Sequence, residues 1–130
     1  MTDDDWNDVV ASLRQVDDLE RMVAAAQRLE REAKLTDVPR SRALLDDPSV
    51  VVREAAAFPL AYLLGPGCLR ELLVAATRGT REGLDNDTLD AAIVEVLSLD
   101  GDGARTALGT LSHDSDLELG LAARAWLERL

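Results

Sequence analysis

The sequence predicts an all-α fold of seven or eight helices that pair and stack into a solenoid. Three observations predict it: the apolar residues are mainly aliphatic, they recur at steps of three and four, and one helical pattern repeats along the chain. Apolar residues make up 47% of the 130 residues, with only one Phe, one Tyr and two Trp. A core of Leu, Val and Ala favours helices over strands.

The first third of the chain predicts two amphipathic helices and a shorter third one. Residues 3–15 place apolar side chains on one face, and residues 16–34 repeat this pattern over a longer stretch. Asp17 or Asp18 is the expected N-cap of the second helix. Residues 38–47 provide about two further turns, with Pro39 suited to a first helical turn.

The stretch Val50 to Leu64 is almost entirely apolar, and Arg53 and Glu54 are its only charges. A membrane span needs about 20 apolar residues, so this stretch is too short for one. It is also longer than most strands and rich in Ala and Leu. A helix that is apolar on every side lies inside a protein. We therefore expect it to be the most buried helix, with a kink at Pro59.

Four further helices are expected in residues 68–130. They occupy residues 68–78, which Gly79 ends; residues 84–99, which Asn86 or Asp87 caps; residues 104–111, which follow the turn "DGDG"; and residues 117–130. In the last helix, Leu117, Leu121 and Leu127 are expected to face the preceding pair, and Trp126 is expected to be at least partly exposed.

An internal repeat relates three of these helices. A shift of 67 residues places Val50, Val52, Ala55, Ala56 and Leu60 on Leu117, Leu119, Ala122, Ala123 and Leu127. A shift of 36 places Ala55, Ala56 and Leu60 on Ala91, Ala92 and Val96, and Glu54 on Asp90. Each copy follows an acidic turn and a shorter helix. Helix pairs that bury their apolar faces only against neighbouring pairs form a solenoid.

The two-helix unit resembles a HEAT repeat. The matching features are the turn with Asp47 and Pro48, then Val52-Arg53, Ala55-Ala56 and Leu60. The resemblance covers roughly residues 35–130, with residues 1–34 as a divergent leading unit of the same single domain. It departs at Leu89 and Gly120, which stand where the arginine is expected. The resemblance implies a right-handed stack of helix pairs that presents a surface to other proteins, as a scaffold does.

The charge distribution predicts a basic protein partner in the cytoplasm. The net charge is −11, and residues 83–130 hold ten acids against three bases. Such a surface repels phosphate backbones and anionic membranes, so neither a nucleic acid nor a membrane is expected to bind. The first residues, "MTDDDW", lack the pattern of a signal peptide.

No combination of residues points to catalysis, a metal or a cofactor. His113 and Cys68 are the only histidine and cysteine, so a zinc site is not expected. "DGDG", residues 100–103, lacks the later ligands of a calcium loop and reads as a turn between helices. We therefore expect a protein that is not an enzyme and uses no cofactor.

The acids near the helix-pair turns are the candidate partner-binding residues. They are Asp85, Asp87, Asp90, Asp114, Asp116 and Glu118, joined by Trp126 as an apolar anchor. In a regular stack these turns fall on one edge, so the acids are expected to form a ridge there. Helix capping explains one or two acids per turn, so both capping and binding remain open.

The function that follows is a non-enzymatic protein-binding module. An acidic solenoid edge suits an inhibitor, for example an immunity protein that covers the basic active site of a nuclease-like toxin. The alternative is a HEAT-like helper subunit of an enzyme or of a cofactor lyase. That alternative needs polar and aromatic groups on the concave face, and the helices expected there are mostly aliphatic.

Overall fold

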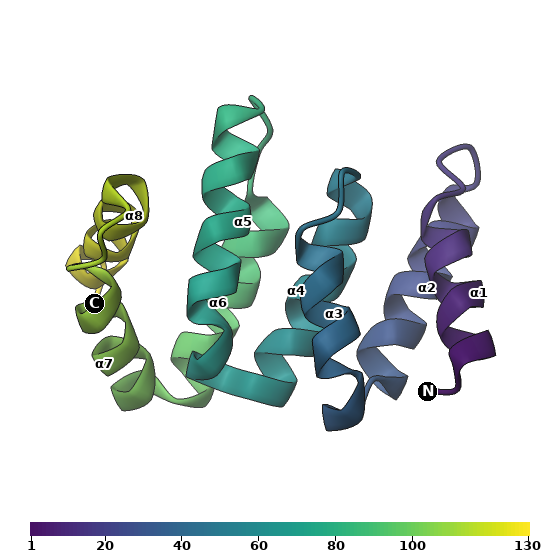
Figure 1. The fold of residues 1–130 in the computed structure, drawn as a ribbon, viewed down its shortest axis with the longest axis horizontal. Coiled ribbons are helices and arrows are strands. Elements are labelled where there is room, and N and C mark those ends of the chain that lie inside the picture. The colour runs from purple at the N-terminus through teal and green to yellow at the C-terminus, as the bar shows by residue number, and fades with distance from the viewer. The chain divides into compact units, whose positions relative to one another are not determined.

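The computed structural model describes residues 1–130 and confirms the all-α class. It contains no strand (Figure 1). The eight α-helices are α1 (Asp3–Leu13), α2 (Leu19–Glu32), α3 (Val38–Leu45), α4 (Val50–Leu64), α5 (Leu69–Arg81), α6 (Asp87–Leu99), α7 (Gly101–Leu111) and α8 (Leu117–Glu128). Two 3-10 turns, η1 (Leu35–Asp37) and η2 (Gly65–Cys68), precede α3 and α5. The right-handed solenoid stays a prediction.

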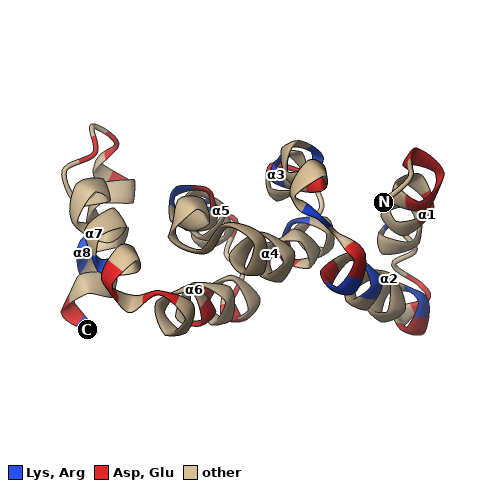
Figure 2. Ribbon diagram, turned by 90° about the horizontal axis from the view of Figure 1, so that it is seen from below, with Lys and Arg blue, Asp and Glu red and all other residues tan.

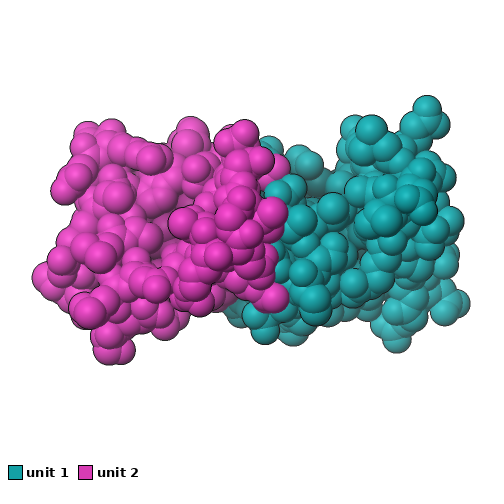
Figure 3. Space-filling model, turned by 90° about the horizontal axis from the view of Figure 1, so that it is seen from above, with its two compact units in different colours: residues 1–63 teal, residues 64–130 magenta.

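The chain divides into two compact units, residues 1–63 and residues 64–130 (Figure 3). The boundary falls at the end of α4, within the stretch where the sequence suggested a continuous array. Each unit has its own buried apolar side chains, including Leu13 and Leu29 in the first and Leu72 and Leu108 in the second.

In the first unit, α1 packs against α2. Its N-terminal end is held by a buried ionic cluster around Asp37. The Met1 α-ammonium lies 3.1 Å from Asp37 Oδ2, and the Lys34 N–H donates to the same carboxylate. Arg40 also pairs with Asp37 and stacks over the Trp6 ring at 4.4 Å. Burial favours the neutral form of Asp37, but these donors outweigh it and lower the pKa of that carboxyl.

α4 has the predicted bounds and more buried residues than any other helix. Arg53 is 1% exposed, and its Nη1 donates to the carbonyl oxygens of Asp47 (2.9 Å) and Pro48 (3.3 Å). The helical run Val50–Arg81 is the one stretch long and apolar enough to cross a membrane by length and composition, and 44% of its most apolar window is buried. A buried core helix meets the same criterion.

In the second unit, α5 contacts α6, α7 and α8, and α7 packs against both α6 and α8. The expectation that Gly79 ends α5 is wrong, because the helix continues to Arg81 and the chain turns at Gly83, with φ of +74°. Gly79 instead gives room to Asn86, whose Oδ1 would lie 2.3 Å from a Cβ at that position. Asn86 Nδ2 donates to the carbonyl of Ala76 at 3.0 Å, which fixes the α5–α6 turn.

The burial pattern follows the internal repeat. All four buried residues of α6 coincide with buried residues of α4 at the shift of 36, and all four of α8 do so at the shift of 67. The shared central position holds alanine three times, and each alanine is fully buried: Ala56, Ala92 and Ala123. A small residue there lets another backbone approach closely.

The α7 and α8 expectations need two corrections. α7 begins at Gly101 rather than after "DGDG", because Asp100 caps it by accepting the Gly103 N–H at 2.9 Å. In α8, Leu117 and Leu121 are 79% and 61% exposed, so they do not face the preceding pair. The buried face of α8 instead consists of Leu119, Gly120, Ala123 and Trp126. It lies on a different side of the helix from the predicted face.

Candidate functional site

The acids of the α7–α8 turn are engaged within the protein. Asp116 caps α8 by accepting the N–H groups of Glu118 and Leu119 at 3.0 and 3.3 Å. Asp114 accepts the Asp116 N–H at 2.9 Å and forms an ion pair with Arg70. The backbone bond, followed by the arginine, lowers the pKa of Asp114. Glu118 pairs with Arg81 at 2.9 Å. Capping and charge pairing therefore account for this group.

These ion pairs show how the turn lies on α5. Arg70 and Arg81 are eleven residues apart on that helix, which corresponds to roughly 16 Å along its axis. Asp114 is held near one end of α5 and Glu118 near the other. Asp114 and Glu118 thus face α5 arginines. They do not simply continue the acids of the α5–α6 turn as an unneutralised ridge.

The acids of α6 are different because none of them has a basic partner. Asp85 accepts the Asp87 N–H at 3.2 Å in the turn before the helix. Asp87, Asp90 and Glu95 lie on α6, which has no Lys or Arg, and no ion pair joins them to another helix. Figure 2 shows red without blue along α6. Three carboxylates of one helix are therefore available to a cation from outside.

Asp90 is the most unusual of the three. It is half-buried, and burial raises the pKa of its carboxyl, with the nearby charge of Asp87 adding to the effect. Arg129 opposes this rise electrostatically without forming a salt bridge to Asp90. A partly desolvated carboxylate without a close counter-ion gains when a cation arrives.

The expectation that Trp126 is exposed is wrong. Its side chain is 7% exposed, because it lies on the buried face of α8, and the Arg129 guanidinium covers the ring at 4.3 Å. As a result, Trp126 has no free surface to offer as an apolar anchor. The large exposed apolar side chains of α6 and α8 are instead Val94, Leu99, Leu117 and Leu121.

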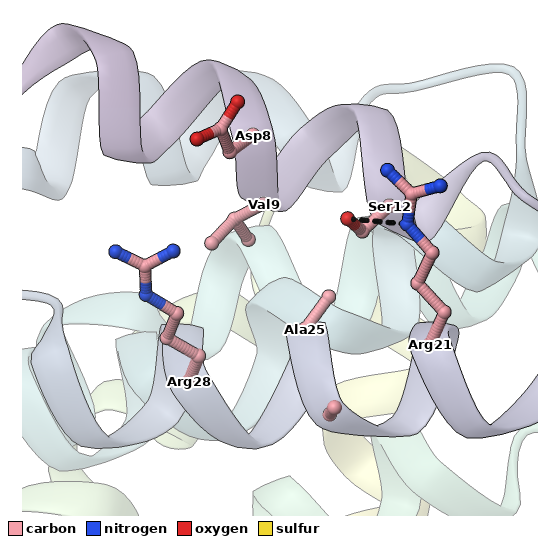
Figure 4. A pocket seen from close by; sticks show the side chains of 7 residues that line it. Asp8, Val9, Ser12, Arg21, Ala25 and Arg28 are labelled. Atoms are coloured by element: carbon pink, nitrogen blue, oxygen red, sulfur yellow. Dashed lines mark hydrogen bonds between the residues drawn. The ribbon is translucent and has the colours of Figure 1, made fainter.

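A small cavity between α1 and α2 was not predicted from the sequence (Figure 4). Its volume is about 180 Å³, and it is lined by Asp8, Val9, Ser12, Arg21, Ala24, Ala25 and Arg28. Arg21 Nε donates to Ser12 Oγ at 3.0 Å, while Arg28 is paired with Asp5 and Glu32. The two arginines stand seven residues apart on α2, a spacing that places them on one face. This spacing of the two arginines is the feature of the sequence that could have indicated the cavity.

The only cysteine and the only histidine differ in exposure. Cys68 is buried, and its Sγ lies 3.1 Å from the carbonyl oxygen of Gly65. His113 lies exposed in the α7–α8 turn. No group of three or more His, Cys, Asp or Glu side chains is placed to hold a metal ion.

The arrangement as a whole offers charge for binding, and α6 carries three carboxylates without an ion pair and no base. Exposed Ala91 and Val94 stand between them on the same helix. A side chain that brings both a positive charge and apolar surface would complement this helix. No protein-family model, no curated protein and no solved structure matches the chain.

Proposed function

We propose that this chain is a protein-binding module that docks a basic protein partner. The observation that carries the proposal is the contrast between α6 and the other acidic segments. In α1, Asp3 pairs with Arg40 and Asp5 with Arg28. In the α7–α8 turn, Asp114 and Glu118 pair with α5, and Asp116 caps α8. Only α6 combines three acids, no base and no ion pair. The helix dipole favours Asp87 and Asp90 in the first turn, but it does not require α6 to lack bases.

The charge of the second unit supports the same reading. Residues 64–130 hold twelve acids and six bases, a net charge of −6, and Arg70, Arg78 and Arg81 are already occupied by acids of the unit. An acidic surface speeds the association of a basic partner, and the effect weakens as salt rises. Under this proposal the chain acts as a cytoplasmic binding protein, with the inhibitor or immunity role as its most specific form.

The HEAT-like stack is part of the proposal. Its support is the repeated burial pattern of α4, α6 and α8 and their shared central alanine. Repeated helix pairs of this kind expose the outer faces of successive helices to partners. A protein-binding role suits that arrangement.

The test measures how fast the purified chain associates with a purified partner. Partners are captured by cross-linking in source cells, expressed alone, and mixed with the purified chain at several salt concentrations. We expect a partner with a basic contact face and an association rate that falls steeply with salt. A partner with an acidic contact face, or an association rate independent of salt, would contradict the proposal.

A further inference from the structure

We propose that the outer face of α6 docks a basic amphipathic α-helix of the partner. This outer face is defined as Asp87, Asp90, Ala91, Val94 and Ser98. The inference rests on the proposed function and specifies where the partner binds and in what form.

The outer face is a continuous strip at helical spacing. Its members stand at i, i+3, i+4, i+7 and i+11, so they share one side of α6. The opposite side carries the buried residues Leu89, Ala92, Ile93 and Val96. Val94 is 50% exposed, and Asp87, Ala91 and Ser98 are also exposed. Asp90, at the edge of the strip, is half-buried.

The shape of the strip favours a helical partner. One extended binding mode adds a strand to the free edge of a sheet, and this protein has no strand. A helix instead packs through its own i, i+3, i+4 and i+7 side chains. Ala91 at the centre of the strip is small, so a second helix can approach closely. The thirteen residues of α6 extend over roughly 20 Å, enough for about three and a half turns of a partner.

The charges of the strip favour a basic partner. Asp87 and Asp90 lie in the first turn and Glu95 lies beside Val94, so acids flank the apolar centre. Asp90 is half-buried and has no salt-bridge partner, since Arg129 stacks on Trp126 instead. An incoming arginine would form a charge-assisted hydrogen bond with it. The complementary helix therefore carries apolar residues along one side and Lys or Arg next to them.

The experiment uses three synthetic peptides of about five helical turns. The first is an amphipathic Leu/Arg helix, the second has the same residues in a scrambled order, and the third has Glu in place of Arg. Binding to the full-length ¹⁵N-labelled chain is followed by amide chemical shifts and by fluorescence anisotropy of labelled peptide. We expect the first peptide alone to bind well and to shift the amides of residues 87–99.

Two variants locate the charges. Asp87→Asn with Asp90→Asn should weaken the first peptide about tenfold, because it removes both negative charges of the strip. Asp4→Asn with Asp8→Asn is the matched control, since these exposed α1 acids are also unpaired, and it should change affinity less than about twofold. Val94→Ser tests the apolar centre and should weaken binding without changing its salt dependence.

The outcomes separate this inference from the proposed function. If both double variants weaken peptide binding equally, or if the amide chemical shifts change outside α6, the α6 site is wrong. Either result leaves the proposed binding of a basic partner untouched. Equal binding of the scrambled peptide would overturn the helical form. If no basic peptide binds, the α6 inference fails, and the salt dependence of the captured complex then decides the proposed function independently.

Discussion

The α3–α4 turn of the first unit and the α7–α8 turn of the second are built alike around an aspartate. Asp47 and Asp114 are related by the shift of 67 residues. Each accepts the N–H of the residue two positions later at 2.9 Å, Ser49 in one case and Asp116 in the other. Each also pairs with an arginine from elsewhere in its unit, Arg14 at the end of α1 or Arg70 on α5. The repeat thus preserves a hydrogen-bonding pattern as well as an apolar one.

The two turns differ in how the following helix meets them. In the first unit, buried Arg53 donates to the carbonyls of Asp47 and Pro48. In the second, Gly120 stands at the matching position, where a Cβ would lie 3.2 Å from the carbonyl oxygen of Ser112. One turn is joined to its helix by a side chain, and the other by close backbone packing. One fold position therefore accepts very different residues when the distance between the segments also changes.

The two units should differ most in how much unfolding free energy they lose when Leu60 or its counterpart Leu127 is truncated. Leu60 is fully buried, so Leu60→Ala should lower the free energy of unfolding by roughly 2–5 kcal/mol. Leu127 is only half-buried, and Leu127→Ala should cost about 1 kcal/mol. Urea unfolding followed by circular dichroism measures both. Similar losses at the two sites would show that the units are packed more alike than their burial indicates.

The close packing at Gly120 predicts a marked penalty for a larger residue. Gly120→Leu introduces the residue found at the matching α6 position, Leu89, and should cost about 1–3 kcal/mol because the α7–α8 turn must move. Gly109→Ala is the control within the same unit. No atom lies within 4 Å of a Cβ there, so this change should stabilise α7 by about 0.5–1 kcal/mol. If Gly120→Leu proved neutral, the close approach would not be a constraint.

Arg53 should matter through its hydrogen bonds to the turn. Arg53→Met keeps much of the side-chain volume but removes the donors to the two carbonyls, and a loss of about 1–3 kcal/mol is expected. Hydrogen exchange at Ser49 and Val50 should increase in this variant. Unchanged exchange would mean that Asp47 alone holds the turn.

The smallest expected effect concerns two aspartates whose pKa values move in opposite directions. The Arg14 guanidinium, helped by the Ser49 N–H, lowers the pKa of Asp47 below its ordinary value of 3.8, whereas burial raises the pKa of Asp90 above it. Stability from Asp47 is present above 3.8 and lost as pH falls through its lowered pKa. Asp90 adds stability as pH falls through its raised pKa towards 3.8, because the folded state takes up the proton first.

Carboxyl carbon NMR titration measures both pKa values directly. Asp47→Asn should flatten the acid end of the curve of unfolding free energy against pH. Asp90→Asn should remove the gain in stability that occurs as pH falls through the raised pKa of Asp90. An Asp90 carboxyl that titrates at or below Asp47 would contradict the burial argument.

Sequence reasoning succeeded where the signal was local. The bounds of α4 followed from its apolar run, and Asp18, one of the two candidate caps of α2, followed from the neighbouring side chains. It failed where the buried face of a helix depends on which other helices pack against it. Leu117, Leu119 and Leu121 offer two apolar faces on α8, and only the contact with α5 and α7 selects the one that holds Leu119.

Among the candidate site residues, the acidic positions could be located from the sequence but their partners could not. Arg70 and Arg81 are 44 and 37 residues from Asp114 and Glu118, so local spacing gives no sign of either pair. The same limit applies to Gly79, which resembles a helix end until Asn86 is seen beside it.

The two tryptophans, each stacked under an arginine, give the chain an optical reporter in each unit. Trp6 belongs to the first unit and Trp126 to the second, and both are 7% exposed in the folded state. Emission from a Trp6→Phe variant therefore follows unfolding of residues 64–130, and emission from a Trp126→Phe variant follows residues 1–63. Coincident melting curves would mean that the units unfold as one cooperative system, and separated curves would give each unit its own stability.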